Sequence, residues 1–178
     1  MKYAASILLC ILFVASPYTV WAGSYNVELV GRDSLGPAAD IYVVDHHAYL
    51  CAGGMVIVLD ISDPSNPVEV SRIYTPGMAL AVHVFDGFAY VADRREGLRV
   101  INISDLKNPQ EVGYYDTPGG AHDVHIAENK TYKKIHAYVA DGDFLRVLDV
   151  SDPGNPHGAG LCCWALCLCN WLRWSSDR

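Results

Sequence analysis

The pattern of apolar and polar residues repeats along the chain with a period of about forty residues. Within each period, short runs rich in valine, isoleucine, leucine and tyrosine are separated by turn residues such as Asp86-Gly87 and Asp141-Gly142. Short runs of β-branched and aromatic residues bounded by glycine predict β-strands rather than helices. The predicted strands lie at residues 41–44, 48–51 and 56–61, at 82–85, 89–93 and 98–103, and at 124–127, 137–141 and 145–150.

A turn containing proline and asparagine closes each period and leads into a fourth predicted strand. It reads Ser-Asp-Pro-Ser-Asn-Pro at residues 62–67, returns at 104–109 and begins a third time at 151–156. Its aspartate can accept hydrogen bonds from backbone N–H groups about two residues on, and proline fixes φ within the turn. Four strands in about forty residues are the sequence pattern of a β-propeller blade, so the sequence predicts an all-β fold.

The units resemble LVIVD repeats. The resemblance rests on Leu-Arg-Val-Ile-Asn-Ile at 98–103 and Leu-Arg-Val-Leu-Asp-Val at 145–150, with Tyr-Val-Ala-Asp before each and the asparagine-proline turn after it. It covers roughly residues 25–157. The resemblance implies a β-propeller in a secreted or surface-exposed protein, usually bacterial or archaeal, and it implies no particular biochemical activity.

The number of predicted blades is smaller than a closed ring requires. Residues 25–36 align with the strand that follows the turn at 68–77, so the ordered region is predicted to begin on an outer strand. Residues 23–160 then hold about three four-stranded blades of roughly 42 residues, whereas closed propellers have about 4–8 blades. We therefore expect a partial propeller whose open apolar face favours aggregation or oligomerisation.

Both ends of the chain differ from the repeats. Residues 1–22 combine Lys2 with an apolar run and a small residue at Ala22, which predicts a cleaved secretory signal peptide, with an uncleaved membrane anchor as the alternative. Residues 161–178 form a tail with three of the four tryptophans and four of the six cysteines. We interpret this tail either as out-of-frame sequence or as a genuine Cys/Trp-rich extension for docking or membrane contact. Its cysteine spacing fits a zinc site poorly.

The formal net charge of −7 results from 13 lysines and arginines against 20 aspartates and glutamates. This sign argues against a nucleic-acid partner and against binding to an anionic membrane surface. With the signal peptide removed, no membrane span is predicted. We therefore expect a secreted protein, extracellular or at the cell surface, with a protein or a surface glycan as its partner.

Histidines are the first candidates for chemistry. His83 and His125 occupy equivalent positions on the predicted innermost strands, and His122-Asp123 lies just before the second of them. Such a group could hold a metal ion near a propeller channel. However, the first unit has Tyr42 at the equivalent position, which favours packed, hydrogen-bonded side chains. The sequence therefore assigns no catalytic, cofactor-binding or metal-binding residue.

Other recurring polar residues are interpreted as structural. Asp93 and Asp141 end equivalent strands and are expected to stabilise turns. Arg99 and Arg146 also recur, and they are expected to pair with acidic residues between blades. Cys51 matches alanines in the later units, which predicts a small buried residue rather than a nucleophile.

These observations favour a non-catalytic extracellular binding or interaction scaffold built from β-propeller repeats. The alternative is a metal-dependent hydrolase or lyase with its site in the propeller channel, for which His83, His122 and His125 are the residues to test. The sequence contains no Gly-rich phosphate loop, no Gly-x-Ser-x-Gly and no His-Glu-x-x-His motif.

Overall fold

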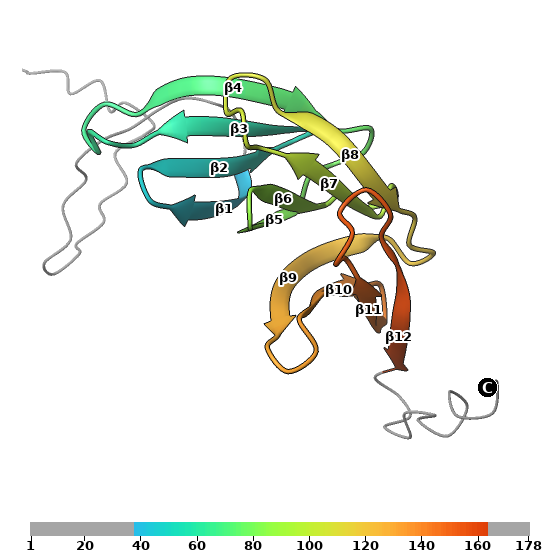
Figure 1. Ribbon diagram of the computed structural model, residues 1–178. Helices are drawn as coiled ribbons and strands as arrows, with labels where there is room; N and C mark the ends of the chain where they lie inside the picture. Colours follow the sequence, from blue (N-terminus) through green and yellow to red (C-terminus); the bar gives the residue numbers. More distant parts are fainter. Residues whose placement is uncertain (1–37, 164–178) are drawn as a thin grey trace, which may run out of the picture.

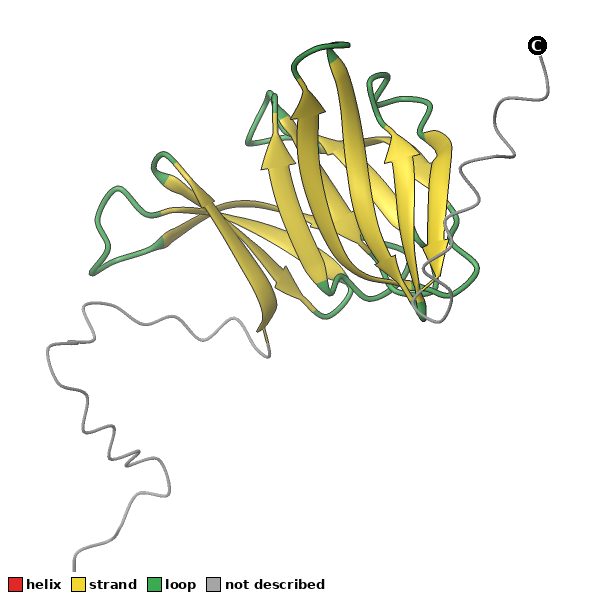
Figure 2. Cartoon of the chain, turned by 90° about the horizontal axis from the view of Figure 1, so that it is seen from below, coloured by secondary structure: helices red, strands yellow, loops and turns green. Residues whose placement is uncertain are grey.

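The computed structural model describes residues 38–163, which form twelve β-strands and, within that range, no helix (Figures 1 and 2). The strands build three four-stranded antiparallel sheets, and within each sheet the strands pair in the order of the sequence. The predicted all-β fold, a partial propeller of three blades, is confirmed. This part of the chain also holds no helix able to cross a membrane. The predicted signal peptide and the predicted leading strand at 25–36 lie outside the described residues.

The three sheets are named blades 1, 2 and 3 in chain order, and the first strand of each is its inner strand. Blade 1 consists of β1 (Ala38–Val44), β2 (His47–Ala52), β3 (Met55–Asp60) and β4 (Val68–Tyr74). Blade 2 consists of β5 (Ala81–Phe85), β6 (Phe88–Ala92), β7 (Leu98–Asn102) and β8 (Gln110–Tyr115). Blade 3 consists of β9 (Ala121–Asn129), β10 (Lys134–Asp141), β11 (Phe144–Asp149) and β12 (His157–Cys163). Because β12 ends at Cys163, the first residues of the predicted tail belong to the outer strand of blade 3.

The hydrophobic core lies between consecutive blades, where the inner strand β5 packs against β1 on one side and β9 on the other. We call the face of a blade that is turned towards the next blade its trailing face, and the opposite one its leading face. Side chains alternate along each strand, so one set of apolar residues serves each face. One core cluster joins the trailing face of blade 1 to the leading face of blade 2: Tyr49, Cys51, Val56, Val58, Val82, Ala89, Val91, Ile101 and Ile103. A second cluster joins blades 2 and 3 in the same way: Tyr90, Ala92, Leu98, Val100, Val124, Ile126, Ala137, Val139, Leu148 and Val150.

The turn before each outer strand has the hydrogen bonds that the sequence predicts. The carboxylate of Asp63 accepts from the backbone N–H of Ser65 at 3.0 Å, and Asp105 and Asp152 accept from the residue two positions on at 3.1 Å each. A second turn of the same type, not predicted, precedes it. In this turn the last side chain of β3, β7 and β11 accepts a hydrogen bond from the backbone N–H of the serine two residues on. Asp60 accepts from Ser62, Asn102 from Ser104 and Asp149 from Ser151.

The turns of blades 2 and 3 also rest on the outer strand of the preceding blade. The Ser71 hydroxyl of β4 donates to the carbonyl oxygen of Leu106 at 2.6 Å. At the next junction Gly113 occupies the position of Ser71, and a Cβ atom there would lie 2.3 Å from the carbonyl oxygen of Pro153. The turn of blade 3 therefore packs directly on the backbone of β8.

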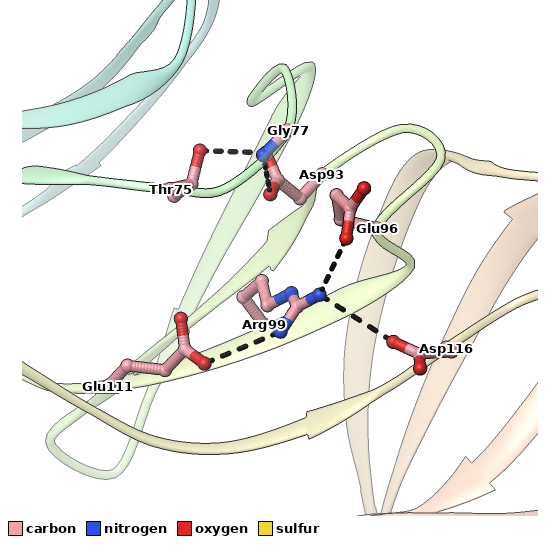
Figure 3. A network of polar contacts seen from close by, with 7 residues as sticks. All are labelled: Thr75, Gly77, Asp93, Glu96, Arg99, Glu111 and Asp116. Carbon is pink, nitrogen blue, oxygen red and sulfur yellow. Dashed lines mark hydrogen bonds and ion pairs between the residues drawn. The ribbon is translucent and has the colours of Figure 1, made fainter.

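A buried carboxylate fixes the connector between blades 1 and 2. The connector Thr75-Pro76-Gly77 leaves β4, and its Thr75 hydroxyl and Gly77 N–H both donate to Asp93 at 2.7 Å (Figure 3). Asp93 directly follows β6 and is fully buried. Burial raises the pKa of Asp93, and the bonds from Thr75 and Gly77 oppose that rise. Gly77 has no room for a side chain, because a Cβ atom would lie 2.4 Å from the Asp93 carbonyl oxygen.

The equivalent connector between blades 2 and 3 is bound differently. Gly119 N–H donates to the buried carboxylate of Asp141 at 2.8 Å, as Gly77 does to Asp93. Arg146 occupies the other carboxylate oxygen, at 2.9 Å from Nε and 2.8 Å from Nη2. The Thr117 hydroxyl is buried and has no hydrogen-bond partner among residues 38–163. The same Thr-Pro-Gly sequence thus makes one bond fewer at the second junction.

This difference gives a matched pair of substitutions. Thr75→Val removes a hydroxyl that bonds to a buried carboxylate, so it should lower the free energy of unfolding by about 1–3 kcal/mol. Thr117→Val removes a buried hydroxyl without a partner, so it should be neutral or stabilising. Urea unfolding of the two variants beside the unsubstituted chain measures both effects. Equal destabilisation by the two substitutions would contradict this account.

Candidate functional site

The inner strands bring three equivalent side chains into one row. Tyr42 of β1, His83 of β5 and His125 of β9 stand at the same position of their blades. The ring centroids of Tyr42 and His83 are 4.7 Å apart, and those of His83 and His125 are 4.6 Å apart with the rings nearly perpendicular. Tyr42 and His83 are half-buried, whereas His125 is exposed. The inner-strand row is therefore a continuous edge of aromatic rings.

The middle ring of this row titrates differently from a free histidine. Burial lowers the pKa of His83, and the neighbouring His125 lowers it further because two imidazolium charges repel. The carboxylate of Asp123 opposes part of that shift. The neutral form of His83 is thus favoured in the folded chain.

The structure joins only part of the predicted histidine group. His83 and His125 lie in contact, whereas His122 and Asp123 are exposed residues of β9. The Asp123 carboxylate accepts from the backbone N–H of Val124 at 2.8 Å. Between residues 38 and 163, no three histidine, cysteine or acidic side chains lie close enough together to hold a metal ion.

The recurring arginines make ion pairs within a blade, which corrects the prediction of pairs between blades. Arg99 of β7 lies 3.2 Å from Glu96 and 3.5 Å from both Glu111 and Asp116, all in blade 2 or at its end (Figure 3). Arg146 binds Asp141 of its own blade. The physical reason is reach: each arginine lies on a central strand, next to acidic residues of the same sheet.

The remaining polar candidates are used by the fold. Asp93 and Asp141 bind the connectors, and both are inaccessible to solvent. Cys51 is completely buried between blades 1 and 2. Burial, followed by the charges of Asp40 and Asp93, raises the pKa of the Cys51 thiol to about 12. At neutral pH this cysteine is a thiol, and it is a poor nucleophile.

An open groove on the outer rim was not predicted from the sequence. It encloses about 530 Å³ between β8 and the turn of blade 3, and its lining residues are Glu111, Val112, Gly113, Tyr114, Gly154 and Asn155. Two of these are glycines, where the junction of blades 1 and 2 has Ser71 and Lys107. The sequence feature that could have indicated the groove is therefore the presence of glycines at the positions equivalent to Ser71 and Lys107.

Tyr114 is the largest exposed side chain of this groove. Its side chain is 57% exposed, and its ring lies 4.8 Å from the guanidinium carbon of Arg99. Arg99 is directly opposite Tyr114 in the β7–β8 pairing and is held by three acidic residues. A cation over the ring face stabilises the ring in place. The orientation of the Tyr114 ring is thus fixed before any partner binds.

The His83 environment predicts a pH dependence of stability. Because the folded-state pKa is below the ordinary value of 6.5, the unfolded chain binds the proton more readily. The stability contributed by neutral His83 is complete above that value and is lost as pH falls through the folded-state pKa. The substitution His83→Tyr introduces the residue that blade 1 has at the equivalent position, Tyr42. It should reduce the fall in the free energy of unfolding, measured with urea, between neutral pH and a pH of about 5. An unchanged pH profile in that variant, with His46→Tyr as control, would contradict the assignment.

Comparison with known proteins agrees with the repeat structure. The LVIVD repeat model matches residues 35–75, 76–117 and 118–162, and each match covers one four-stranded blade, the third up to the last but one residue of β12. No curated protein matches the chain. Since the three matches together span well over half of the sequence, the chain belongs to the LVIVD repeat family.

Proposed function

We propose that this chain is a non-catalytic, extracellular binding scaffold whose outer rim contacts a surface glycan. The observation that carries the proposal is the groove at the junction of blades 2 and 3, with Tyr114 exposed and held over Arg99. Binding sites are typically concave and combine an aromatic or apolar surface with a few polar groups. The predicted signal peptide at residues 1–22 supports an extracellular location.

The groove offers the chemistry that a sugar requires. The exposed ring of Tyr114 provides an apolar face, and Glu111 and Asn155 are lining residues with polar side chains. Sugars present apolar C–H faces next to hydroxyl groups, so ring stacking and hydrogen bonds can act together. Gly154 leaves space for the partner to approach the backbone, because a Cβ atom there would meet no other atom closer than 3.5 Å.

A glycan array tests this proposal with the full chain. Tyr114→Ala should weaken binding to any glycan captured on the array by about tenfold or more, because it removes the largest side chain among the residues that line the groove. Tyr132→Ala is the matched control, since Tyr132 is 76% exposed on the hairpin between β9 and β10. The proposal is wrong if no glycan is bound, or if both variants bind as strongly as the unsubstituted chain.

The contact between His83 and His125 favours a second candidate, a metal-dependent hydrolase or lyase that uses His83, His122 and His125. Imidazole nitrogens are common ligands of zinc and other transition metals. For such an enzyme, elemental analysis of the purified full chain should find one divalent ion per molecule, and His125→Ala should remove it. For a scaffold, the metal content should be substoichiometric and unaffected by His125→Ala.

A further inference from the structure

The trailing face of blade 3 has the same arrangement of side chains as the buried trailing faces of blades 1 and 2. However, no other blade among residues 38–163 covers it. In blade 2, Tyr90 pairs with Val100 and Ala92 with Leu98; in blade 3, Tyr138 pairs with Val147 and Ala140 with Leu145. Tyr90 and Leu98 are 1% and 0% exposed, because the leading face of blade 3 covers them. Tyr138 and Leu145 at the same positions are 37% and 43% exposed. The face is built to be covered by apolar side chains.

The continuation of the chain starts at the edge of this face. β12 ends at Cys163, which is opposite Phe144 in the β11–β12 pairing and therefore next to Leu145. The residues beyond are strongly apolar: Trp164, Leu166, Leu168, Trp171, Leu172 and Trp174. We propose that residues 164–178 fold back over the trailing face of blade 3 and cover it.

The length of this segment is sufficient. Fully extended, it spans up to about 50 Å at 3.3–3.6 Å per residue. Four strands spaced about 4.8 Å apart make a sheet roughly 15 Å wide, so the segment can cross the face with residues to spare. A tryptophan side chain buries about 150–250 Å² when it is covered, so the three in this segment could shield most of the exposed apolar surface.

A second copy of the chain is a weaker candidate for this position. On blade 2 the trailing face is covered by the leading face of the next blade. The leading face of blade 1, the one a second copy would have to offer, is already buried at Ala48, Ile57 and Leu59. In addition, a covalently attached segment acts at a high effective concentration, which favours it over a separate molecule.

Tryptophan fluorescence tests the proposal directly, because residues 38–163 contain no tryptophan. In the full chain carrying Trp21→Phe, all tryptophan emission comes from the segment. The emission maximum should lie at short wavelength, and Leu145→Lys should shift it to longer wavelength and increase quenching by acrylamide. Val68→Lys is the matched control, since Val68 is 53% exposed on β4 and away from this face. Emission typical of water-exposed tryptophan in the Trp21→Phe chain would overturn the proposal.

A second measurement does not depend on how Leu145→Lys folds. A photo-cross-linking amino acid in place of Leu145 should form links to residues 164–178 of the same molecule, as identified by mass spectrometry of mixed isotope-labelled and unlabelled chains. Links between labelled and unlabelled chains, or a short-wavelength emission that is lost on dilution, would identify a second copy as the occupant instead. Short-wavelength emission that appears only with phosphatidylcholine and phosphatidylglycerol vesicles would identify a membrane. Either result would overturn the proposal.

Discussion

A buried carboxylate at the end of the second strand holds blades 2 and 3 to the connector that precedes each of them. Asp93 and Asp141 are inaccessible to solvent, so leaving them unpaired would be costly, and each accepts a backbone N–H from the Thr-Pro-Gly connector. The glycine of that connector is required because the carboxylate and its backbone leave no room for a Cβ atom. This contact fixes where one blade ends and the next begins. The packing of apolar faces, the row of inner-strand rings and the groove on the outer rim all depend on that spacing.

Much of this fold could be predicted because the same short sequence recurs at a fixed period. Repetition of the aspartate in the Ser-Asp turn identified a structural group, and its hydrogen bonds to the backbone are present in all three turns. The bulges in the outer strands could not be predicted in this way. Val70, Val112 and Ala159 each lie unpaired at the same point of β4, β8 and β12, and a bulge depends on the pairing of two strands rather than on one local sequence. The bulge at Ala159 also shows that blade 3 keeps the repeat geometry at the start of its outer strand.

The candidate sites were predictable to different degrees. Alignment of the repeats placed Tyr42, His83 and His125 at one position, and equivalent positions on adjacent inner strands are neighbours in space. The groove was missed because it lies where the turn of blade 3 meets β8, and two of its lining residues, Gly113 and Gly154, have no side chain that could mark a site in the sequence. The arginine pairs were misassigned because a repeated charge was expected to act between repeats. A long side chain on a central strand instead reaches acidic residues of its own sheet first.

Three equivalent tyrosines show how far a residue's environment depends on the neighbouring blade. Tyr49 and Tyr90 are 3% and 1% exposed, and Tyr138, with the same strand position and the same valine opposite, is 37% exposed. The local sequence is therefore sufficient to form the strand but insufficient to bury its side chains. In repeat structures the stability of each unit includes the contacts with its neighbours, so a unit with one neighbour opens more easily than a unit with two. Blade 2 packs against blades on both faces, whereas blade 3 packs against another blade only through its leading face. Local opening among the described residues should therefore begin at blade 3 rather than at blade 2, and anything that covers Tyr138 and Leu145 also stabilises the junction that forms the groove.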